Sequence, residues 1–222
     1  MLRFSTDIKK CSNCSCLIDN REMERGSLIL TRWTDGKTNH SVANLSGDIR
    51  HNFLVKCPQC LYLVWFKQLQ PVESINSFTS VQEPLKRSTA FSIPKFDDYI
   101  DELKFGRINV ESEKALRTVA WWAGNDARRN RGESIPMLDE EVVNLHTLAA
   151  MLDVSIVHDR LTKVEIKREL RLFDEAEYLI SESFQYKHLE RNKLFIQTLI
   201  QKQDRLVRAY PFIKFESLEP PK

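Results

Sequence analysis

Glycine is scarce in this chain, with six residues among 222. The two that lie closest together, Gly124 and Gly132, are eight positions apart. A loop that cradles a phosphate group needs glycines about two to five positions apart, because several backbone N–H groups must approach the anion together. The sequence therefore excludes a P-loop and the glycine fingerprint of dinucleotide-binding folds.

Long apolar runs and a charge of one sign are missing too. The longest apolar run, 61–66, is far shorter than the roughly 18 residues of a membrane-spanning helix. The first ten residues lack the apolar core of a signal peptide. Lys and Arg total 33 against 31 acidic residues, a net charge of +2, which argues against a dedicated nucleic-acid binder. We predict a cytoplasmic protein with no membrane partner.

Cysteine is concentrated at one end, since all five residues lie within the first 60 positions. An odd number of clustered cysteines in a reducing compartment indicates metal ligands rather than disulfides. Cys11-Ser-Asn-Cys14 and Cys57-Pro-Gln-Cys60 each place two thiols three positions apart, so that a tight turn aims both sulfurs at one point. Two such pairs supply the tetrahedral set of soft ligands that Zn²⁺ prefers.

These pairs resemble the cysteine knuckles of a zinc ribbon, in which the tips of two β-hairpins share one metal. The resemblance covers about residues 9–67 and implies a structural Zn²⁺ with the ligands Cys11, Cys14, Cys57 and Cys60. Two features depart from the pattern: 42 residues separate the pairs, which implies an inserted β-hairpin, and Leu61 stands where a small residue is common. The fifth thiol, Cys16, is either a spare or a replacement for Cys14, with His40 and His51 as more remote substitutes.

Composition divides the chain into three parts and predicts an α+β fold. We expect a zinc-ribbon-like antiparallel β module at 1–70, a linker at 71–95 and an all-α helical-hairpin domain at 96–222. Runs rich in β-branched and aromatic residues predict strands at 27–33, 41–45, 53–57 and 61–66. Asp35-Gly36 predicts a tight turn after the first of them. The run 61–66 is apolar on both faces, so another segment should cover it. Pro, Ser and Thr without helical periodicity at 71–95 indicate a linker or a loosely packed crossing strand.

Helix-compatible sequence fills the last part, because only one proline and no glycine lie between Glu133 and Tyr210. Asp139 and Ser155 stand where helix N-caps belong, and short connections favour antiparallel hairpins. We predict helices at 96–105, 111–129, 138–152, 156–171, 174–184 and 187–207.

One stretch of this part, 164–176, resembles the turn between the paired helices of a tetratricopeptide repeat. Phe173, Asp174, Glu175 and Ala176 match in order the aromatic, acidic and small residues of that turn. Arg171 occupies the place where glycine is typical. Such repeats usually come in threes or more, so a single match implies a repeat-like helical hairpin rather than an array.

A second stretch, 116–129, resembles bacterial proteins that join a cysteine-knuckle N-terminus to helical hairpins, a likeness that implies no activity. For Trp121 and Trp122 we favour packing in the core over anchoring a partner. Their basic neighbours Arg128, Arg129 and Arg131 suit the C-terminal end of a helix better than a phosphate site.

The sequence therefore predicts a non-enzymatic, zinc-containing binding or adaptor protein that presents a protein-partner surface on its helices. It predicts no catalytic and no cofactor-binding residue, since no nucleophile or metalloprotease motif occurs. A regulatory nucleic-acid-binding ribbon is the alternative, and a metal-dependent enzyme is the third choice. The alternative would use stacking aromatics and a basic track, namely Trp33, Trp65, Lys9, Lys10, Arg50, Lys56 and Lys67.

Overall fold

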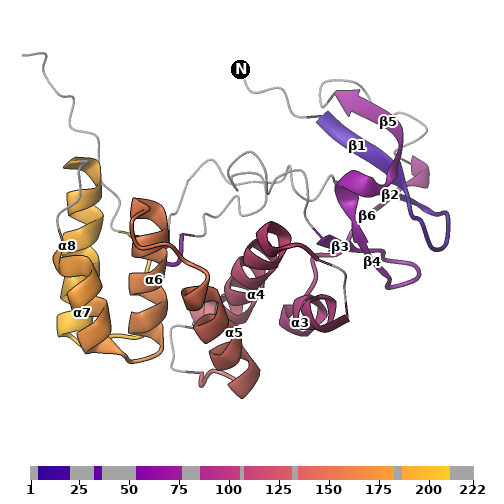
Figure 1. The fold of residues 1–222 in the computed structure, drawn as a ribbon. Helices are drawn as coiled ribbons and strands as arrows, with labels where there is room; N and C mark the ends of the chain where they lie inside the picture. Colours follow the sequence, from indigo (N-terminus) through magenta and orange to yellow (C-terminus); the bar gives the residue numbers. More distant parts are fainter. Residues whose placement is uncertain are drawn as a thin grey trace, which may run out of the picture. The chain divides into compact units, whose positions relative to one another are not determined.

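The structure is a computed structural model, and it describes residues 5–20, 33–36, 54–76, 86–105, 108–131, 135–182 and 187–210. Short strands come first and helices follow, which confirms the α+β class (Figure 1). The chain divides into two compact units: unit 1 comprises Met1–Leu30 and Asn39–Gly124, and unit 2 comprises Thr31–Thr38 and Asn125–Lys222. The border falls inside helix α4 (Val110–Arg131) and not at the predicted linker.

Unit 1 contains a four-stranded sheet that includes part of the expected linker. In the order β5-β1-β2-β6 its strands are Gln70–Asn76, Ser5–Lys10, Leu17–Asp19 and Thr89–Ala90. β1 pairs antiparallel with β2 and with β5, whereas β2 and β6 run parallel. β5 is an edge strand, which explains why it tolerates Pro71. The stretch 71–95 thus contains strands, the alternative to a linker that its sequence left open.

A separate hairpin pairs β3 (Leu54–Lys56) with β4 (Leu63–Trp65), as the sequence predicted for 53–57 and 61–66. A short 3₁₀ helix, η1 (Phe66–Gln68), follows β4. Ser92 joins this hairpin to the larger sheet, because Lys56 N–H donates to Ser92 O and Ser92 N–H to Lys56 O, each at 2.9 Å. The neighbouring Phe91 N–H donates to Asp19 O of β2 at 3.1 Å, so residues 89–92 contact both hairpins.

Both faces of β4 are covered, as its apolar sequence required. Val64 packs in a cluster with Cys11 and Cys57. On the other face, Leu63 and Trp65 pack against α3 (Phe96–Phe105) and the first turns of α4. Lys56 of β3 also forms an ion pair with Asp98 of α3, 2.8 Å from Nζ to Oδ1. Helix α3 therefore belongs to the same unit as the β module.

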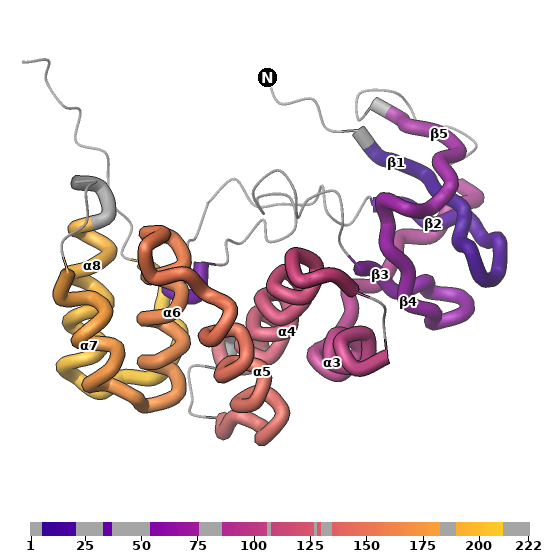
Figure 2. The backbone as a smooth tube through the Cα atoms, in the orientation of Figure 1, coloured from indigo at the N-terminus to yellow at the C-terminus, as the bar shows by residue number. Residues whose placement is uncertain are grey.

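Unit 2 is built mainly from helices, seen as the orange to yellow part of Figure 2. Their bounds are Asp139–Ala150 for α5, Val157–Glu169 for α6, Phe173–Ser181 for α7 and Lys187–Gln201 for α8. Every helix predicted from the sequence is found among the described residues. The core of this unit contains Val164 of α6, Ala176 and Ile180 of α7, and Ile196 and Ile200 of α8.

The turn between α6 and α7 has the geometry that its repeat-like sequence implies. Arg171 adopts φ of 63°, the left-handed conformation for which glycine is typical. Its N–H donates to Arg168 O at 3.0 Å, and Leu172 N–H donates to Lys167 O at 2.9 Å. These two bonds form a Schellman motif, which closes α6. Ala176 is fully buried at the helix contact.

Some predicted helix ends differ from the structure. Leu138 and Ile156 are the N-caps of α5 and α6, so the prediction of Asp139 and Ser155 was wrong by one residue in each case. Helix α8 ends at Gln201 instead of 207 because Gln203 turns left-handed at φ of 49°. Residues 202–210 are therefore not helical.

Unit 2 also includes residues 33–36, which lie in the sequence between the two cysteine pairs. Trp33 forms a β-bridge with Ala209, and Thr34 N–H donates to Arg208 O at 2.9 Å. Gly36 adopts φ of 82° and its N–H donates to Trp33 O at 2.9 Å, which confirms the predicted tight turn. The strands predicted at 27–33 and 41–45 lie outside the described residues, apart from Trp33.

Candidate metal centre

Each cysteine pair lies at the tip of a β-hairpin, and the two tips share one backbone pattern. Residues 11–16 connect β1 to β2, and residues 57–62 connect β3 to β4. In the first tip, Cys11 N–H donates to Cys16 O at 2.9 Å and Ser15 N–H donates to Cys11 O at 3.0 Å. The second tip repeats both bonds: Cys57 N–H donates to Tyr62 O at 3.0 Å and Leu61 N–H to Cys57 O at 2.9 Å.

The fifth residue of each tip has the same unusual backbone conformation. Ser15 and Leu61 adopt φ of 61° and 59°, in the left-handed region that favours glycine. Leu61, which stands where a small residue is common, thus adopts a conformation that glycine reaches more easily. Leu61 is 63% exposed, so its side chain gains little packing in return.

Together the two tips gather five thiols. The sulfurs of four of them lie within 4.8 Å of one another and could hold a metal ion: Cys11, Cys14, Cys16 and Cys57. Cys60 stands outside this group of four, but its Sγ lies 3.8 Å from Cys11 Sγ. All five cysteines are free thiols. Three of the predicted ligands, Cys11, Cys14 and Cys57, thus lie in one group with Cys16, and the fourth, Cys60, lies beside Cys11. His40 and His51 lie outside the described residues.

The distances between the two tips fit a tetrahedral ion. Four sulfurs at about 2.3 Å from a Zn²⁺ are about 3.8 Å apart along every edge of the tetrahedron. The measured separations are 3.8 Å between Cys11 and Cys60 and 3.7 Å between Cys14 and Cys57. The Cys16 sulfur is closer to its neighbours, at 3.2 Å from Cys14 and 3.3 Å from Cys57. The donor set and these two edges suit a thiolate-bound metal.

Two of the thiols favour the protonated form in the absence of a cation. Burial raises the pKa of Cys11 to about 11, although backbone N–H groups of Cys14 and Asn13 act in the opposite direction. Burial also raises the pKa of Cys16 above its usual range, helped by its contacts with the Cys14 and Cys57 sulfurs. A bound divalent cation reverses this preference, because a coordinating thiol is deprotonated.

In the second cysteine of each pair the pKa of the thiol is lowered, which shifts it toward the thiolate, the form that binds metals. A hydrogen bond from the Asn13 side chain and another from the Tyr62 backbone lower the pKa of Cys60 to about 6. The backbone of Cys16 likewise lowers the pKa of Cys14. Asn13 belongs to the first tip and Cys60 to the second, so this bond joins the two.

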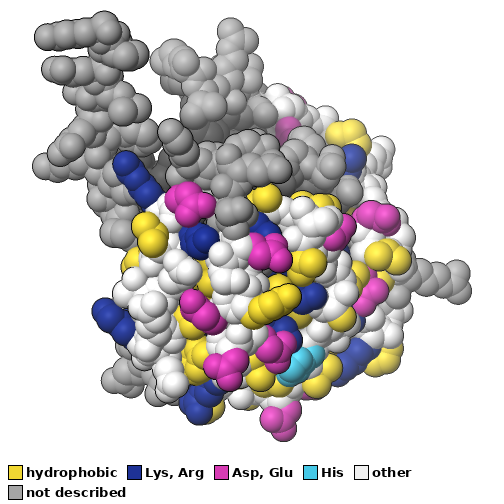
Figure 3. Space-filling view, turned by 60° about the vertical axis from the view of Figure 1, so that its left-hand side comes forward, with side chains coloured by type: hydrophobic (Ala, Val, Ile, Leu, Met, Phe, Trp, Pro, Cys, Tyr) yellow, Lys and Arg dark blue, Asp and Glu magenta, His cyan; other side chains and the backbone are white. Residues whose placement is uncertain are grey.

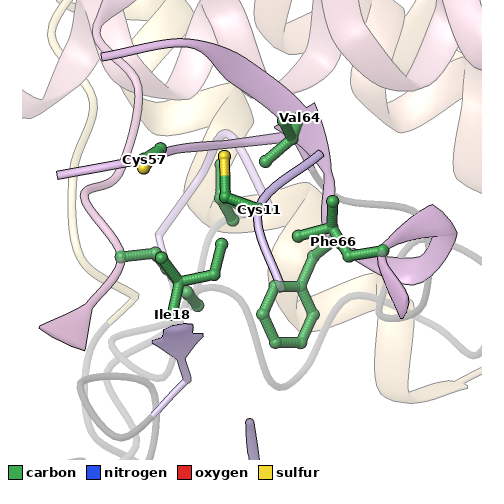
Figure 4. Close-up of a cluster of buried hydrophobic side chains, with 8 residues drawn as sticks. Cys11, Ile18, Cys57, Val64 and Phe66 are labelled. Atoms are coloured by element: carbon green, nitrogen blue, oxygen red, sulfur yellow. The ribbon is translucent and has the colours of Figure 1, made fainter. Parts of the chain in front are cut away.

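The five thiols lie beside a small apolar core. Figure 4 shows Cys11 in the middle of this core, with Cys57, Ile18, Val64 and Phe66 around it. Phe91 packs edge-on against Phe66, with ring centroids 5.5 Å apart. The inner cysteine of each pair is buried, whereas Cys14 is exposed and Cys60 is partly exposed. The cluster therefore lies between a hydrophobic floor and solvent.

Two of the basic residues that a nucleic-acid-binding ribbon would use are engaged in contacts within unit 1. Lys56 is paired with Asp98, and Lys9 Nζ lies 4.8 Å from the centre of the Phe66 ring. Trp65 packs against the helices of unit 1, so its ring is not a free stacking surface. Lys10 and Lys67 are exposed, and Arg50 lies outside the described residues.

The tryptophan pair is buried, and two of the arginines that follow it form ion pairs. Trp121 and Trp122 are 3% and 9% exposed, which confirms packing in the core and contradicts a role as partner anchors. Arg128 forms a bidentate ion pair with Glu141, with nitrogen–oxygen distances of 3.1 and 2.7 Å. Arg129 pairs with Asp35 and with Asp126. The side chain of Arg131 lies outside the described residues.

Sequence reasoning missed a buried ionic network in unit 2. Arg168 and Glu165 of α6 are fully buried and paired, and Glu169 is buried beside them. Asn125 of α4 donates to Glu169 at 3.4 Å and to Asp35 at 3.2 Å. The signal available in the sequence was the spacing of Glu165 and Arg168, three positions apart, which is also common on exposed helix faces.

The chain matches no protein-family model, and no curated protein and no solved structure is significantly similar to it. Across the part of the chain that the structure describes, every helix is too short or too polar to span a lipid bilayer.

Proposed function

We propose that unit 1 is a zinc ribbon and that one Zn²⁺ binds to Cys11, Cys14, Cys57 and Cys60. The observation that carries this proposal is the matched pair of hairpin tips, with the same two backbone hydrogen bonds in each. Two sulfur–sulfur separations between the tips, 3.8 and 3.7 Å, have the length of a tetrahedral edge. Zinc is the metal most often found in a closed site of four thiolates.

The role of the metal is structural. Protein thiolates fill all four positions, so no position remains for the water or substrate that a catalytic zinc would bind. The strands at the site are short, with three residues each in β2, β3 and β4. A core of this size is marginal, and a four-ligand zinc site contributes on the order of 10 kcal/mol of apparent folding free energy in small domains.

We infer that the whole chain is a non-enzymatic cytoplasmic binding or adaptor protein and that its helices bind a protein partner. Exposed apolar side chains on three helices support this role: Val143 of α5, Tyr178 of α7 and Leu194 of α8. In Figure 3, hydrophobic side chains lie between acidic and basic ones, without a continuous basic track on the visible face. Such a mixed surface suits a protein partner better than an acidic polymer.

Metal content is the first test of this function. Chain purified without added metal, and measured by elemental mass spectrometry, is expected to carry one zinc per molecule. Substitution by Co²⁺ is expected to give the charge-transfer absorption of a thiolate-bound ion. Cys57→Ser should reduce both signals, whereas Ser12→Ala, at an exposed position of the other tip and without a thiol, should leave both unchanged. A wild-type chain that folds and binds neither metal would overturn the zinc ribbon.

The partner class requires a separate experiment. Affinity capture from native lysate, with and without nuclease, distinguishes a protein partner from nucleic acid. Partners that remain after nuclease and are lost with Tyr178→Ala or Leu194→Ala support the adaptor. Val110→Ala, at an exposed apolar position of unit 1, is the matched control. Recovery that depends wholly on nucleic acid would favour the ribbon as a nucleic-acid-binding module instead.

A further inference from the structure

The two hairpin tips together carry one thiol more than a tetrahedral site uses. The first tip holds the extra one: Cys16 directly precedes β2, and its carbonyl accepts the hydrogen bond from Cys11 N–H. The equivalent residue of the second tip is Tyr62, whose side chain is exposed and is not a metal ligand. The cluster is therefore asymmetric, with three thiols from one tip and two from the other.

The extra thiol lies against the site. Cys16 Sγ is 3.3 Å from Cys57 Sγ of the other tip and 3.2 Å from Cys14 Sγ. The mutually close group of four sulfurs includes Cys16 and leaves out Cys60. Cys60, in turn, lies 3.8 Å from Cys11, a separation that equals a tetrahedral edge. Two different sulfurs thus satisfy two different requirements of the fourth ligand.

We propose that the site has two interchangeable ligand sets, which share Cys11, Cys14 and Cys57 and take either Cys60 or Cys16 as the fourth thiolate. This proposal rests on the proposed function, because it concerns the same metal. Cys60 and Cys16 are both only partly buried, so each can move while the buried Cys11 and Cys57 stay fixed in the core.

Exchange between the two sets needs only a small displacement. The Cys16 sulfur must retreat by about 0.5 Å from Cys14 and Cys57 to reach the tetrahedral edge. In the exchange a bond from the metal to Cys16 forms as the bond to Cys60 breaks. The Cys16 thiol gives its proton to water as its sulfur binds, and Cys60 leaves as a thiolate, so no oxidant or reductant is required.

The consequence is a metal centre that keeps its ion when either Cys16 or Cys60 is lost. With one of these two thiols removed, the other completes the set of four. When both are removed, only three thiolates remain. Since four thiolates together supply the zinc affinity of a structural site, each contributes about 100-fold on average.

The experiment compares Cys60→Ser, Cys16→Ser and the double variant Cys16→Ser/Cys60→Ser in the full chain. Zn²⁺ affinity is measured by competition with a chromogenic chelator, and the Co²⁺ spectrum reports how many thiolates bind. Each single variant is expected to keep one metal, an affinity within about tenfold of wild type and a four-thiolate spectrum. The double variant should lose about 100-fold or more.

The outcomes separate the two proposals. If Cys60→Ser alone loses as much affinity as the double variant, Cys16 is no ligand and the exchange is refuted, while the zinc ribbon stands. If the double variant binds as tightly as wild type, water or serine fills the fourth position, which also refutes the exchange. Failure of the wild-type chain to bind any metal refutes the proposed function itself. Far-ultraviolet circular dichroism of each variant verifies that it is folded.

Discussion

Replacing Arg168 by methionine is expected to destabilise unit 2 severely. Its side chain is 0% exposed, and its Nε and Nη2 donate to the two oxygens of Glu165 at 2.8 and 2.6 Å. Nη2 also donates to Leu206 O at 2.8 Å, and Nη1 donates to Asp204 O. One guanidinium thus holds a buried carboxylate and the segment that follows α8. Burial alone would lower the pKa of Arg168, but the charge of Glu165 and its hydrogen bonds raise it, so the group stays ionised.

The magnitude follows from what the substitution leaves behind. Breaking a buried ion pair by removing one partner costs about 3–5 kcal/mol, because the other charge stays buried without compensation. Two backbone carbonyls also lose their donor, at about 1–3 kcal/mol each where water cannot reach them. We expect Arg168→Met to lower the free energy of unfolding by at least about 4 kcal/mol. That is a large share of the roughly 5–15 kcal/mol that stabilises a typical domain.

Urea unfolding, followed by circular dichroism at the helical minimum, measures this loss. Arg117→Met is the matched control, because Arg117 pairs with Glu113 on a partly exposed face of α4 and should cost less than about 1 kcal/mol. The double variant Glu165→Leu/Arg168→Met removes the stranded charge and should recover about 2 kcal/mol or more. If the free energy of unfolding of Arg168→Met lies within about 1 kcal/mol of the wild-type value, the buried ion pair does not stabilise unit 2 as argued.

Three further predictions concern unit 1. Chelation of the metal should unfold the hairpins of residues 1–70 and leave the signal of α5–α8 intact; a β-region signal that survives metal removal contradicts this. Leu61→Gly should raise the free energy of unfolding by about 1 kcal/mol, since it relieves the left-handed strain at an exposed position, whereas Leu61→Ala should leave the thermal midpoint nearly unchanged. Burial raises the pKa of Asp98, but the bond from Lys56 more than offsets it and the pKa is lowered. The stability from this pair is therefore present above the ordinary carboxyl pKa and lost as pH falls through the lowered one, so wild type and Asp98→Asn should differ by less than about 1 kcal/mol at neutral pH and converge in acid unfolding titrations.

The helices were predictable because their signals are local. The stripe that includes Leu145 and Leu148 in α5 recurs at helical spacing, and both side chains are buried in the structure. Helix ends were less predictable. Arg171 and Gln203 terminate α6 and α8 in left-handed conformations without the glycine that usually marks such an end. Residues other than glycine reach this conformation because the surrounding chain over-determines it, and no local pattern reports that constraint.

The edge strand β5 could not be assigned from its sequence alone. That sequence, Gln-Pro-Val-Glu-Ser-Ile-Asn, contains a proline and left a linker and a crossing strand open. What makes it a strand is the ladder with β1, which lies sixty or more positions earlier in the chain. Strand propensity depends on the pairing partner and on burial, and neither is visible in seven residues.

The metal centre divides in the same way. The spacing of Cys11, Cys14, Cys57 and Cys60 was enough to indicate a thiolate-bound metal ion, because thiols three positions apart in a turn converge whatever surrounds them. Only the tertiary structure brought Cys16 to 3.3 Å from Cys57, since that approach depends on how two distant hairpins face each other.

The sequence by itself determined the element types of the helices, the α+β class and the thiol-rich character of the candidate metal centre, because periodicity and turn chemistry are properties of neighbouring residues. The tertiary structure decided which segments share a unit. It placed α3 with the β module and residues 33–36 with the helices. It also buried Arg168 with Glu165, a pair that looks in sequence like any exposed helical ion pair. These outcomes depend on contacts between residues far apart in the chain, which no short pattern encodes.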